Sequence, residues 1–197
     1  MNKKRKVQTT IKPEPKAIRN EYEEHSVKGF YEKFGDEYRN PHESAIRKVL
    51  EIAVVKWQVD LSKVLDLACG SGEVTLALKS LGCSHIDGID PYTGNAYFNR
   101  TGQIAETYTF EDIASGIISD RSYSLIVCSF AMHLVNSSRL PLLVYQLSLI
   151  GDSMIIIMPH KRPELKPEWG WTFLDEIAVD RVRARFLISD ELRNNNK

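Results

Sequence analysis

The sequence predicts a doubly wound α/β domain, in which helices cover both faces of a mostly parallel sheet. Strand-like and helix-like segments alternate between about residue 40 and residue 160, and such alternation is typical of a parallel sheet with helical crossovers. A length of 197 residues suits a single domain, since a chain of this size buries roughly 70% of its unfolded surface. Hydrophobic residues make up 43% and charged residues 26%, which is the composition of an ordinary soluble globular protein.

Five short apolar segments are the predicted strands, and they span residues 63–67, 85–90, 107–110, 124–129 and 153–158. The predicted helices span residues 40–56, 73–81, 112–118 and 139–149. The first helix is expected to begin with an Asn40 cap and Pro41 at its first position. Gly82 is expected to end the second helix.

The C-terminal edge of the sheet leaves two alternatives. Residues 177–188 alternate like one more strand, but a finishing hairpin needs two. Either residues 171–179 supply the second strand, or the sheet is shortened at this edge. A shortened edge would leave room for a partner subunit.

Polar tails flank the predicted domain of residues 21–192. Residues 1–20 are rich in Lys, Pro and Thr, so we expect a flexible basic tail, and residues 193–197 are expected to be disordered. Lys3 to Val7 resemble a short nuclear-import signal, with a solvated basic run as the equal alternative. The expected location is therefore nuclear or cytoplasmic.

Charge and cysteine content exclude several classes of protein. The 26 basic and 26 acidic side chains balance, so no bulk electrostatic attraction to nucleic acid is implied, although a local basic patch stays open. Cys69, Cys83 and Cys128 are odd in number and lack the pair spacing of zinc or redox sites, which predicts reduced thiols and no metal site. No apolar run approaches the roughly 18 residues that span a bilayer, so no membrane association is expected.

The strongest motif is Val64-Leu65-Asp66-Leu67-Ala68-Cys69-Gly70-Ser71-Gly72, where a predicted buried strand meets a helix. Gly70 and Gly72 let the backbone come close to a ligand, and the free amides of the helix start face its polar groups. The next strand ends in Asp90, 18 residues after Gly72. An acid at that place can accept hydrogen bonds from both hydroxyls of a ribose.

This pair of signals resembles the class I S-adenosylmethionine-dependent methyltransferases, whose first motif commonly reads LDLGCGSG. Here Ala68 stands at the first glycine. The resemblance implies S-adenosylmethionine as cofactor, with Asp66 near the methionine amine. The alternative is that Asp66 is only a turn acceptor. A dinucleotide site is disfavoured because Glu73 would repel a pyrophosphate.

The same resemblance implies further cofactor contacts. Asp112 corresponds to the acceptor for the adenine amine, with a helix cap as the alternative. Ser129 lies in the loop that the family places beside the methionine part of the cofactor. Tyr38 and Arg39 belong to a segment that the family folds over the cofactor as a lid. The alternative for that segment is a surface helix.

The acceptor side is less defined. His133 and His160 can each act as a general base, although a lone loop histidine is more often a plain polar residue. Residues 159–163 carry cations, and the nearby Trp169 and Trp171 can stack on bases or simply close the sheet edge.

We therefore expect a methyltransferase whose acceptor is RNA or protein rather than a small molecule. The alternative is a non-catalytic scaffold that works as a partner subunit of a larger complex. Asn-Pro-Pro-Tyr, an amino-methylating signature that would name a target atom, is absent from the sequence.

Overall fold

The computed structural model describes Gly35 and residues 39–195. Its strands are β1 (Val64–Leu67), β2 (Ile86–Ile89), β3 (Tyr123–Ser129), β4 (Gly151–Met158), β5 (Trp171–Val179) and β6 (Val182–Ser189). Its helices are α2 (Glu43–Trp57), α3 (Glu73–Ser80), α4 (Gly94–Thr101), α5 (Phe110–Ala114), α6 (Leu140–Ser148) and α7 (Asp190–Asn195), with short 3-10 turns η2 (Met132–Leu134) and η3 (Pro167–Trp169).

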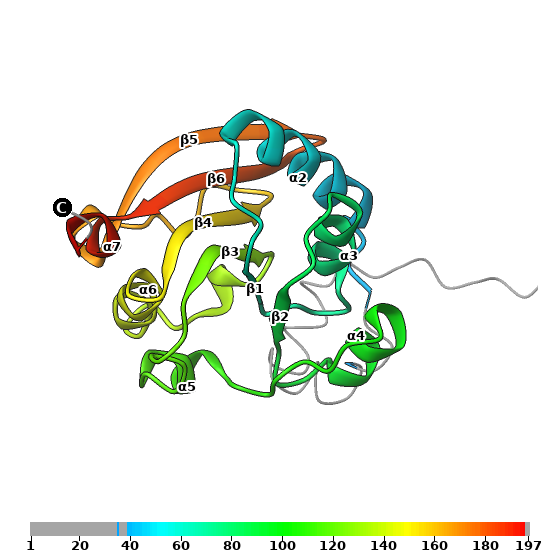
Figure 1. Ribbon diagram of the computed structural model, residues 1–197, viewed down its shortest axis with the longest axis horizontal. Coiled ribbons are helices and arrows are strands. Elements are labelled where there is room, and N and C mark those ends of the chain that lie inside the picture. The colour runs from blue at the N-terminus through cyan, green and yellow to red at the C-terminus, as the bar shows by residue number, and fades with distance from the viewer. Residues whose placement is uncertain (1–34, 36–38, 196–197) are drawn as a thin grey trace, which may run out of the picture.

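One six-stranded sheet, in the order β2-β1-β3-β4-β6-β5, forms the centre of the fold. The first four strands in that order are parallel, whereas β6 runs antiparallel to both β4 and β5. Helices α2 and α3 lie on one side of the sheet, and α5 and α6 lie on the other (Figure 1). The predicted fold class is therefore confirmed.

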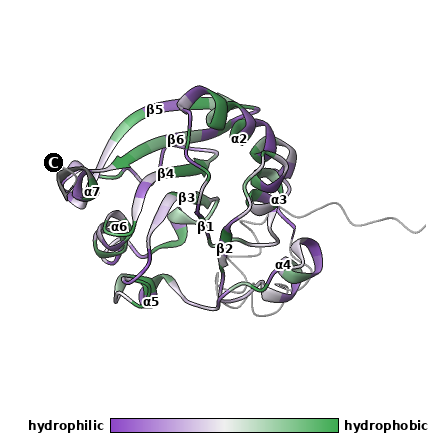
Figure 2. Ribbon diagram, in the orientation of Figure 1, coloured by the Kyte–Doolittle hydropathy of each residue, from purple (hydrophilic) through white to green (hydrophobic). Residues whose placement is uncertain are grey.

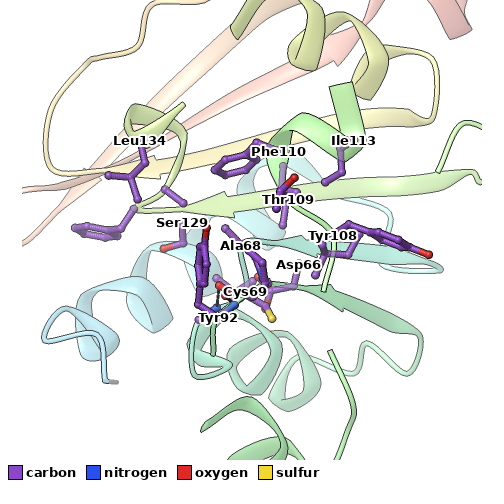
Figure 3. A pocket seen from close by; sticks show the side chains of 18 of the residues that line it. Asp66, Ala68, Cys69, Tyr92, Tyr108, Thr109, Phe110, Ile113, Ser129 and Leu134 are labelled. Atoms are coloured by element: carbon purple, nitrogen blue, oxygen red, sulfur yellow. Dashed lines mark hydrogen bonds between the residues drawn. The ribbon is translucent and has the colours of Figure 1, made fainter. Parts of the chain in front are cut away.

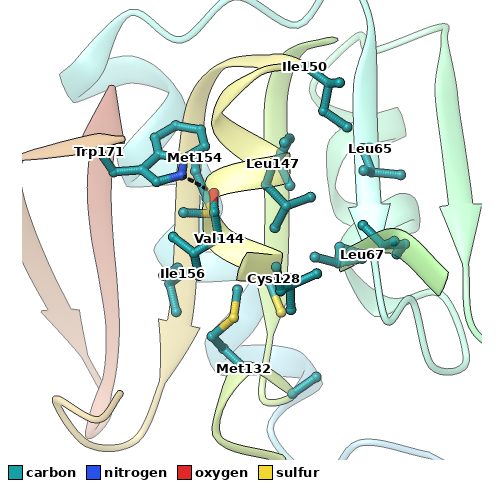
Figure 4. Packing of buried hydrophobic residues seen from close by; sticks show 14 of the residues in the cluster. Leu65, Leu67, Cys128, Met132, Val144, Leu147, Ile150, Met154, Ile156 and Trp171 are labelled. Atoms are coloured by element: carbon teal, nitrogen blue, oxygen red, sulfur yellow. Dashed lines mark hydrogen bonds between the residues drawn. The ribbon is translucent and has the colours of Figure 1, made fainter. Parts of the chain in front are cut away.

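Each face of the sheet has its own hydrophobic core, because successive strand residues point to opposite faces. Leu65 and Leu67 of β1 belong to the core that packs under α5 and α6. Figure 4 shows these two leucines in one cluster with Val144 and Leu147 of α6. Val64, one residue earlier, packs with α2 and α3. The central strands β1, β3 and β4 are buried along almost their whole length, and most of β4 is hydrophobic in Figure 2, as expected for strands that are covered on both faces.

The C-terminal edge is a complete hairpin, so the shortened-sheet alternative is wrong. Asp180 and Arg181 both have positive φ, 49° and 68°, and they form the tight turn that separates β5 from β6. The single strand expected over residues 177–188 is therefore two strands. Trp171 is buried, and its Nε1 donates to the Val144 carbonyl at 2.8 Å, so this indole closes the sheet edge and is not available for stacking on a base.

The strand predicted for residues 107–110 is wrong. Beyond β2 the described chain makes a single parallel bridge, Ile89 with Glu106. Thr109 then caps α5, since its hydroxyl accepts from the backbone of Asp112 while the Asp112 carboxylate accepts from the Thr109 backbone. This capping box starts a helix where the β-branched and aromatic residues favoured a strand.

Three helices also differ from expectation. Helix α5 ends at Ala114 and not at residue 118. Helix α4 was not predicted, because its sequence, GNAYFNRT, is short and mostly polar. Helix α2 begins at Glu43 with His42 at the cap position. Asn40 instead forms a turn before the helix, where its Oδ1 accepts from the His42 backbone at 2.9 Å.

The predictions for the tails have different outcomes. The expected import signal at Lys3 to Val7 lies outside the described residues. Helix α7 ends at Asn195, and the disorder expected for residues 193–197 stays a prediction. The Ser189 hydroxyl stabilises the start of this helix by accepting from the Leu192 backbone at 3.2 Å. Within the described part of the chain, every helix is too short or too polar to cross a membrane.

Candidate functional site

A cavity of about 480 Å³ opens at the carboxyl ends of β1, β2 and β3. Strand β1 has β2 on one side and β3 on the other, and ligands of open α/β sheets bind at this kind of switch point. The volume is in the range of small-molecule sites. Side chains from the lining residues converge on this space in Figure 3; the wall includes Asn40, Asp66, Ala68, Cys69, Gly70, Glu73, Asp90, Tyr92, Tyr108, Phe110, Glu111, Ser129 and Phe130.

The turn between β1 and α3 brings the backbone to the cavity. Ala68, Gly70 and Gly72 all have positive φ, at 56°, 54° and 87°. Gly72 is doubly constrained, since a Cβ there would lie 2.5 Å from the Thr101 methyl carbon. Ala68 adopts a conformation that favours glycine, which agrees with its place in the motif.

Asp66 is buried in the floor of the cavity. Burial raises the pKa of its carboxyl to about 7, although the hydrogen bonds from Thr75 act in the opposite direction. The Thr75 hydroxyl lies 3.0 Å from the Tyr97 hydroxyl. Asp66 is therefore a turn acceptor that also lines the cavity, and its place near a methionine amine stays a prediction.

Asp90 organises the turns on both sides of the cavity. One carboxylate oxygen accepts from Gly70 N at 3.1 Å, and the other accepts from Tyr92 N at 2.9 Å and Thr93 N at 3.1 Å. The carboxylate is thereby fixed at the end of β2 with its position set by three backbone amides. Acceptor capacity remains on it, because a carboxylate offers about four lone-pair sites.

The end of β3 contributes a strained and unsatisfied wall. The Ser129 hydroxyl oxygen is buried and has no hydrogen-bond partner among the described residues. The next residue, Phe130, has φ 55°, which is rare for a bulky side chain. Its ring stacks on His42, with centroids 4.8 Å apart. Orphaned polar groups and strained backbone are typical of ligand sites.

Asp112 does not line the cavity. Its carboxylate accepts from the Thr109 backbone at 2.9 Å and from the Thr109 hydroxyl at 2.7 Å, and these bonds lower the pKa of Asp112. The helix-cap interpretation is therefore the one that the contacts favour. Tyr108 and Phe110 of the same segment do line the cavity.

Of the two residues expected to form a lid over the cofactor, Arg39 is among the described residues. Tyr38 lies outside the described residues. Arg39 is exposed and is not among the cavity-lining residues. Asn40, which sequence reasoning used only as a helix cap, is buried and lines the cavity.

The two histidines proposed as general bases lie next to each other but do not line the cavity. Their rings meet edge to face, with centroids 5.7 Å apart. His133 is exposed, but partial desolvation of its ring, and then the neighbouring His160, lowers its pKa. His133 precedes Leu134 of η2, which does line the cavity, so the pair stands beside the site and outside its wall.

Comparison with solved structures identifies the fold. Magnesium protoporphyrin IX methyltransferase from Synechocystis PCC 6803, with S-adenosylmethionine bound, matches with a TM-score of 0.56 and 16% identity, over 88% of this chain and 96% of that one. The N-methyltransferase NodS from Bradyrhizobium japonicum, in complex with S-adenosylhomocysteine, matches with a TM-score of 0.57 and 12% identity, over 80% and 91% of the two chains. The fold is therefore that of the class I S-adenosylmethionine-dependent methyltransferases.

No family model matches the sequence. A curated relative, the uncharacterized protein C17A5.05c of Schizosaccharomyces pombe, is 30% identical over 93% of this chain and 96% of its own length. The chain belongs to the family of this fission yeast protein.

Proposed function

We propose that the protein is a methyltransferase that binds S-adenosylmethionine in the cavity at the ends of β1, β2 and β3. The observation that carries this proposal is the junction of Gly70 with Asp90. It fixes a carboxylate and a close-approaching backbone turn at the switch point of the sheet, where a nucleoside is expected to lie.

The residues present fit this cofactor. Asp90 would accept from the ribose hydroxyls, and the turn at Ala68 and Gly70 would face the rest of the nucleoside and the methionine part. The carboxyl of Asp66 would pair with the methionine ammonium. The buried Ser129 hydroxyl, which has no partner among the described residues, would gain one from the ligand.

The cofactor would supply a methyl group already activated by its sulfonium. The work left to the chain is to bind and orient, and to exclude water. Tyr92, Tyr108 and Phe110 line the cavity with aromatic surface suited to the apolar body of a nucleoside. Because a dedicated base is not required by an activated methyl group, the position of His133 and His160 outside the wall is compatible with transfer.

For the acceptor we propose RNA or protein in preference to a small molecule. Lys161 and Arg162 are exposed in the loop after β4, on the same edge of the sheet as the cavity. Because the whole chain is electrically neutral, tight RNA binding would need contacts from a partner protein. A non-catalytic scaffold is the alternative outcome of the test below.

Titration calorimetry with S-adenosylmethionine tests the cofactor site. Wild type should bind with micromolar affinity. Asp90→Ala should weaken binding by more than about 1.5 kcal/mol, the scale of a charge-assisted hydrogen bond. Gly70→Val should abolish binding in a folded protein, because the side chain enters the space where backbone meets ligand.

Absence of binding by wild type would overturn the cofactor proposal and leave the scaffold alternative. If wild type binds, transfer of labelled methyl groups to separate RNA, protein and small-molecule fractions from a cell extract tests the acceptor. Label in the small-molecule fraction alone would contradict the preferred acceptors.

A further inference from the structure

Helix α4 packs against the glycine turn, residues 68–72, which lines the cavity, and its side chains contact this turn and the start of α3. Tyr97 bonds to Thr75, the partner of Asp66. Thr101 and Tyr97 fill the space beside Gly72. One turn along the same helix, Arg100 reaches the other acid of the turn, Glu73.

Glu73 is the centre of a buried polar cluster. Its side chain is only 5% exposed, and a buried carboxylate is costly unless it is paired and hydrogen-bonded. One oxygen, Oε1, accepts from Arg100 Nη1 at 3.0 Å, from the backbone N–H of Asn40 at 3.1 Å and from the hydroxyl of Ser71. Both Glu73 and Asn40 line the cavity.

Arg100 also reaches the helix that follows Asn40. Its Nη2 pairs with Glu43 at 2.5 Å, in the first turn of α2. A single guanidinium thus joins three segments that are far apart in the sequence: the start of α2, the start of α3 and the end of α4. The fork of an arginine suits two carboxylates at once, whereas a lysine ammonium would be a single point charge.

We propose that Arg100 is a positioning residue that holds the segment before α2 against the glycine turn and so keeps Asn40 in the cavity wall. The inference rests on the proposed cofactor site, because its consequence is a slower release of the bound nucleoside. From Asn40 the connection continues to His42, whose backbone donates to Asn40 and whose ring stacks on Phe130. Loss of the Arg100 ion pairs would therefore disturb both Asn40 and Phe130, which line the cavity.

The experiment compares four proteins by calorimetry and stopped-flow release with S-adenosylhomocysteine as the probe. Arg100→Met should raise Kd at least tenfold, mainly through a faster dissociation rate. The Kd of Arg100→Lys should lie between the Kd of Arg100→Met and that of wild type. Arg183→Met is the matched control, since Arg183 pairs with Glu176 at 2.5 Å on the β5–β6 hairpin and neither residue lines the cavity; it should leave Kd unchanged.

Two further measurements separate positioning from simple destabilisation. Hydrogen exchange at the Asn40 and His42 amides should speed up in Arg100→Met and stay at the wild-type rate in Arg183→Met. Adding Glu73→Gln to Arg100→Met should recover part of the affinity, because glutamine still accepts from Asn40 and Ser71 without a buried charge. Unchanged Kd and exchange in both Arg100 variants would overturn the inference. Failure of wild type to bind would instead overturn the proposed function.

Discussion

The Oδ2 atom of Asp66 accepts two hydrogen bonds from Thr75, one from the backbone N–H at 3.1 Å and one from the hydroxyl at 2.7 Å. These bonds tie the buried strand β1 to the first turn of α3 across the glycine turn. Thr75 is not a cation, so among the described residues the Asp66 carboxylate is stabilised by hydrogen bonds without an ion pair, in a place where burial strongly disfavours its charge.

This arrangement predicts how stability depends on pH. Burial raises the pKa of Asp66 from 3.8 to about 7. Between these two pH values, Asp66 is therefore protonated in the folded protein and ionised in the unfolded chain. The contribution of Asp66 to the free energy of unfolding is therefore fully present at low pH and falls as pH rises towards about 7. Wild type should lose unfolding free energy on the order of 1 kcal/mol or more as pH rises through this range, and Asp66→Asn should not show this loss.

Urea unfolding at about pH 5 and about pH 8 checks this, with wild type and Asp66→Asn treated in parallel. The difference in unfolding free energy between the two pH values should be smaller in the variant. An equal pH dependence in both proteins would mean that Asp66 titrates near its ordinary value in the fold.

Ligand binding should be linked to the same proton. A methionine ammonium beside Asp66 would favour the carboxylate and lower its pKa, so S-adenosylmethionine should release protons when it binds at about pH 6.5. Calorimetry in two buffers of different ionisation enthalpy measures this release. Asp66→Asn is the control, and proton release of the same size in that variant would assign the proton to another group.

The two glycines that flank α3 allow a matched test of the turn. Gly72 and Gly82 have φ of 87° and 93°, so alanine is strained at both, at a cost of roughly 1–2 kcal/mol. The new Cβ would also collide at Gly72, 2.5 Å from Thr101 and 3.3 Å from Tyr97, whereas at Gly82 no atom of the described residues lies within 4 Å. Gly72→Ala should therefore destabilise by about 1–3 kcal/mol more than Gly82→Ala.

Thermal or urea unfolding of both variants gives the comparison directly. Similar losses at both positions would show that backbone strain, and not the contact with α4, is what requires glycine at position 72.

Sequence reasoning succeeded where local pattern and topology agree. Apolar runs predicted β1, β2, β3 and β4 to within about two residues, because strands buried on both faces leave a continuous signal. The sequence also predicted that the glycine turn and Asp90 belong to one site. Both lie at strand ends, and the topology of a parallel sheet brings such ends to one edge.

The remainder depends on long-range contacts that no local pattern encodes. In the sequence, nothing distinguishes Arg100 from a surface arginine. Its ion pairs with Glu43 and Glu73 form because α4 packs behind the glycine turn. Asn40 reads as a helix cap, but its backbone donates to Glu73, which is 33 positions away. Residues 107–110 favour a strand by composition, and only the capping box of Thr109 and Asp112 turns them into the start of a helix.

Ala68 provides a test at the motif position where the family resemblance is imperfect. At φ 56° an alanine is strained, whereas glycine adopts this region freely at some cost in unfolded-state entropy. Ala68→Gly should therefore leave stability unchanged or raise it by up to about 1 kcal/mol. The melting temperature checks this, and a fall of several degrees would show that the Ala68 methyl group contributes packing that outweighs the strain.

His133 and His160 form a pair beside the cavity. Partial desolvation of the His133 ring is the larger cause of its lowered pKa, and the neighbouring His160 lowers the pKa further, because two adjacent imidazolium ions repel each other. His160→Ala should raise the pKa of His133 part of the way towards its ordinary value, since the partial desolvation remains. NMR titration of the His133 ring protons measures the change. Because neither ring lines the cavity, His133→Ala and His160→Ala should both leave the Kd for S-adenosylmethionine within about twofold of wild type. A tenfold loss in either variant would show that the pair acts on the cofactor site, through a movement of η2 that changes the wall at Leu134.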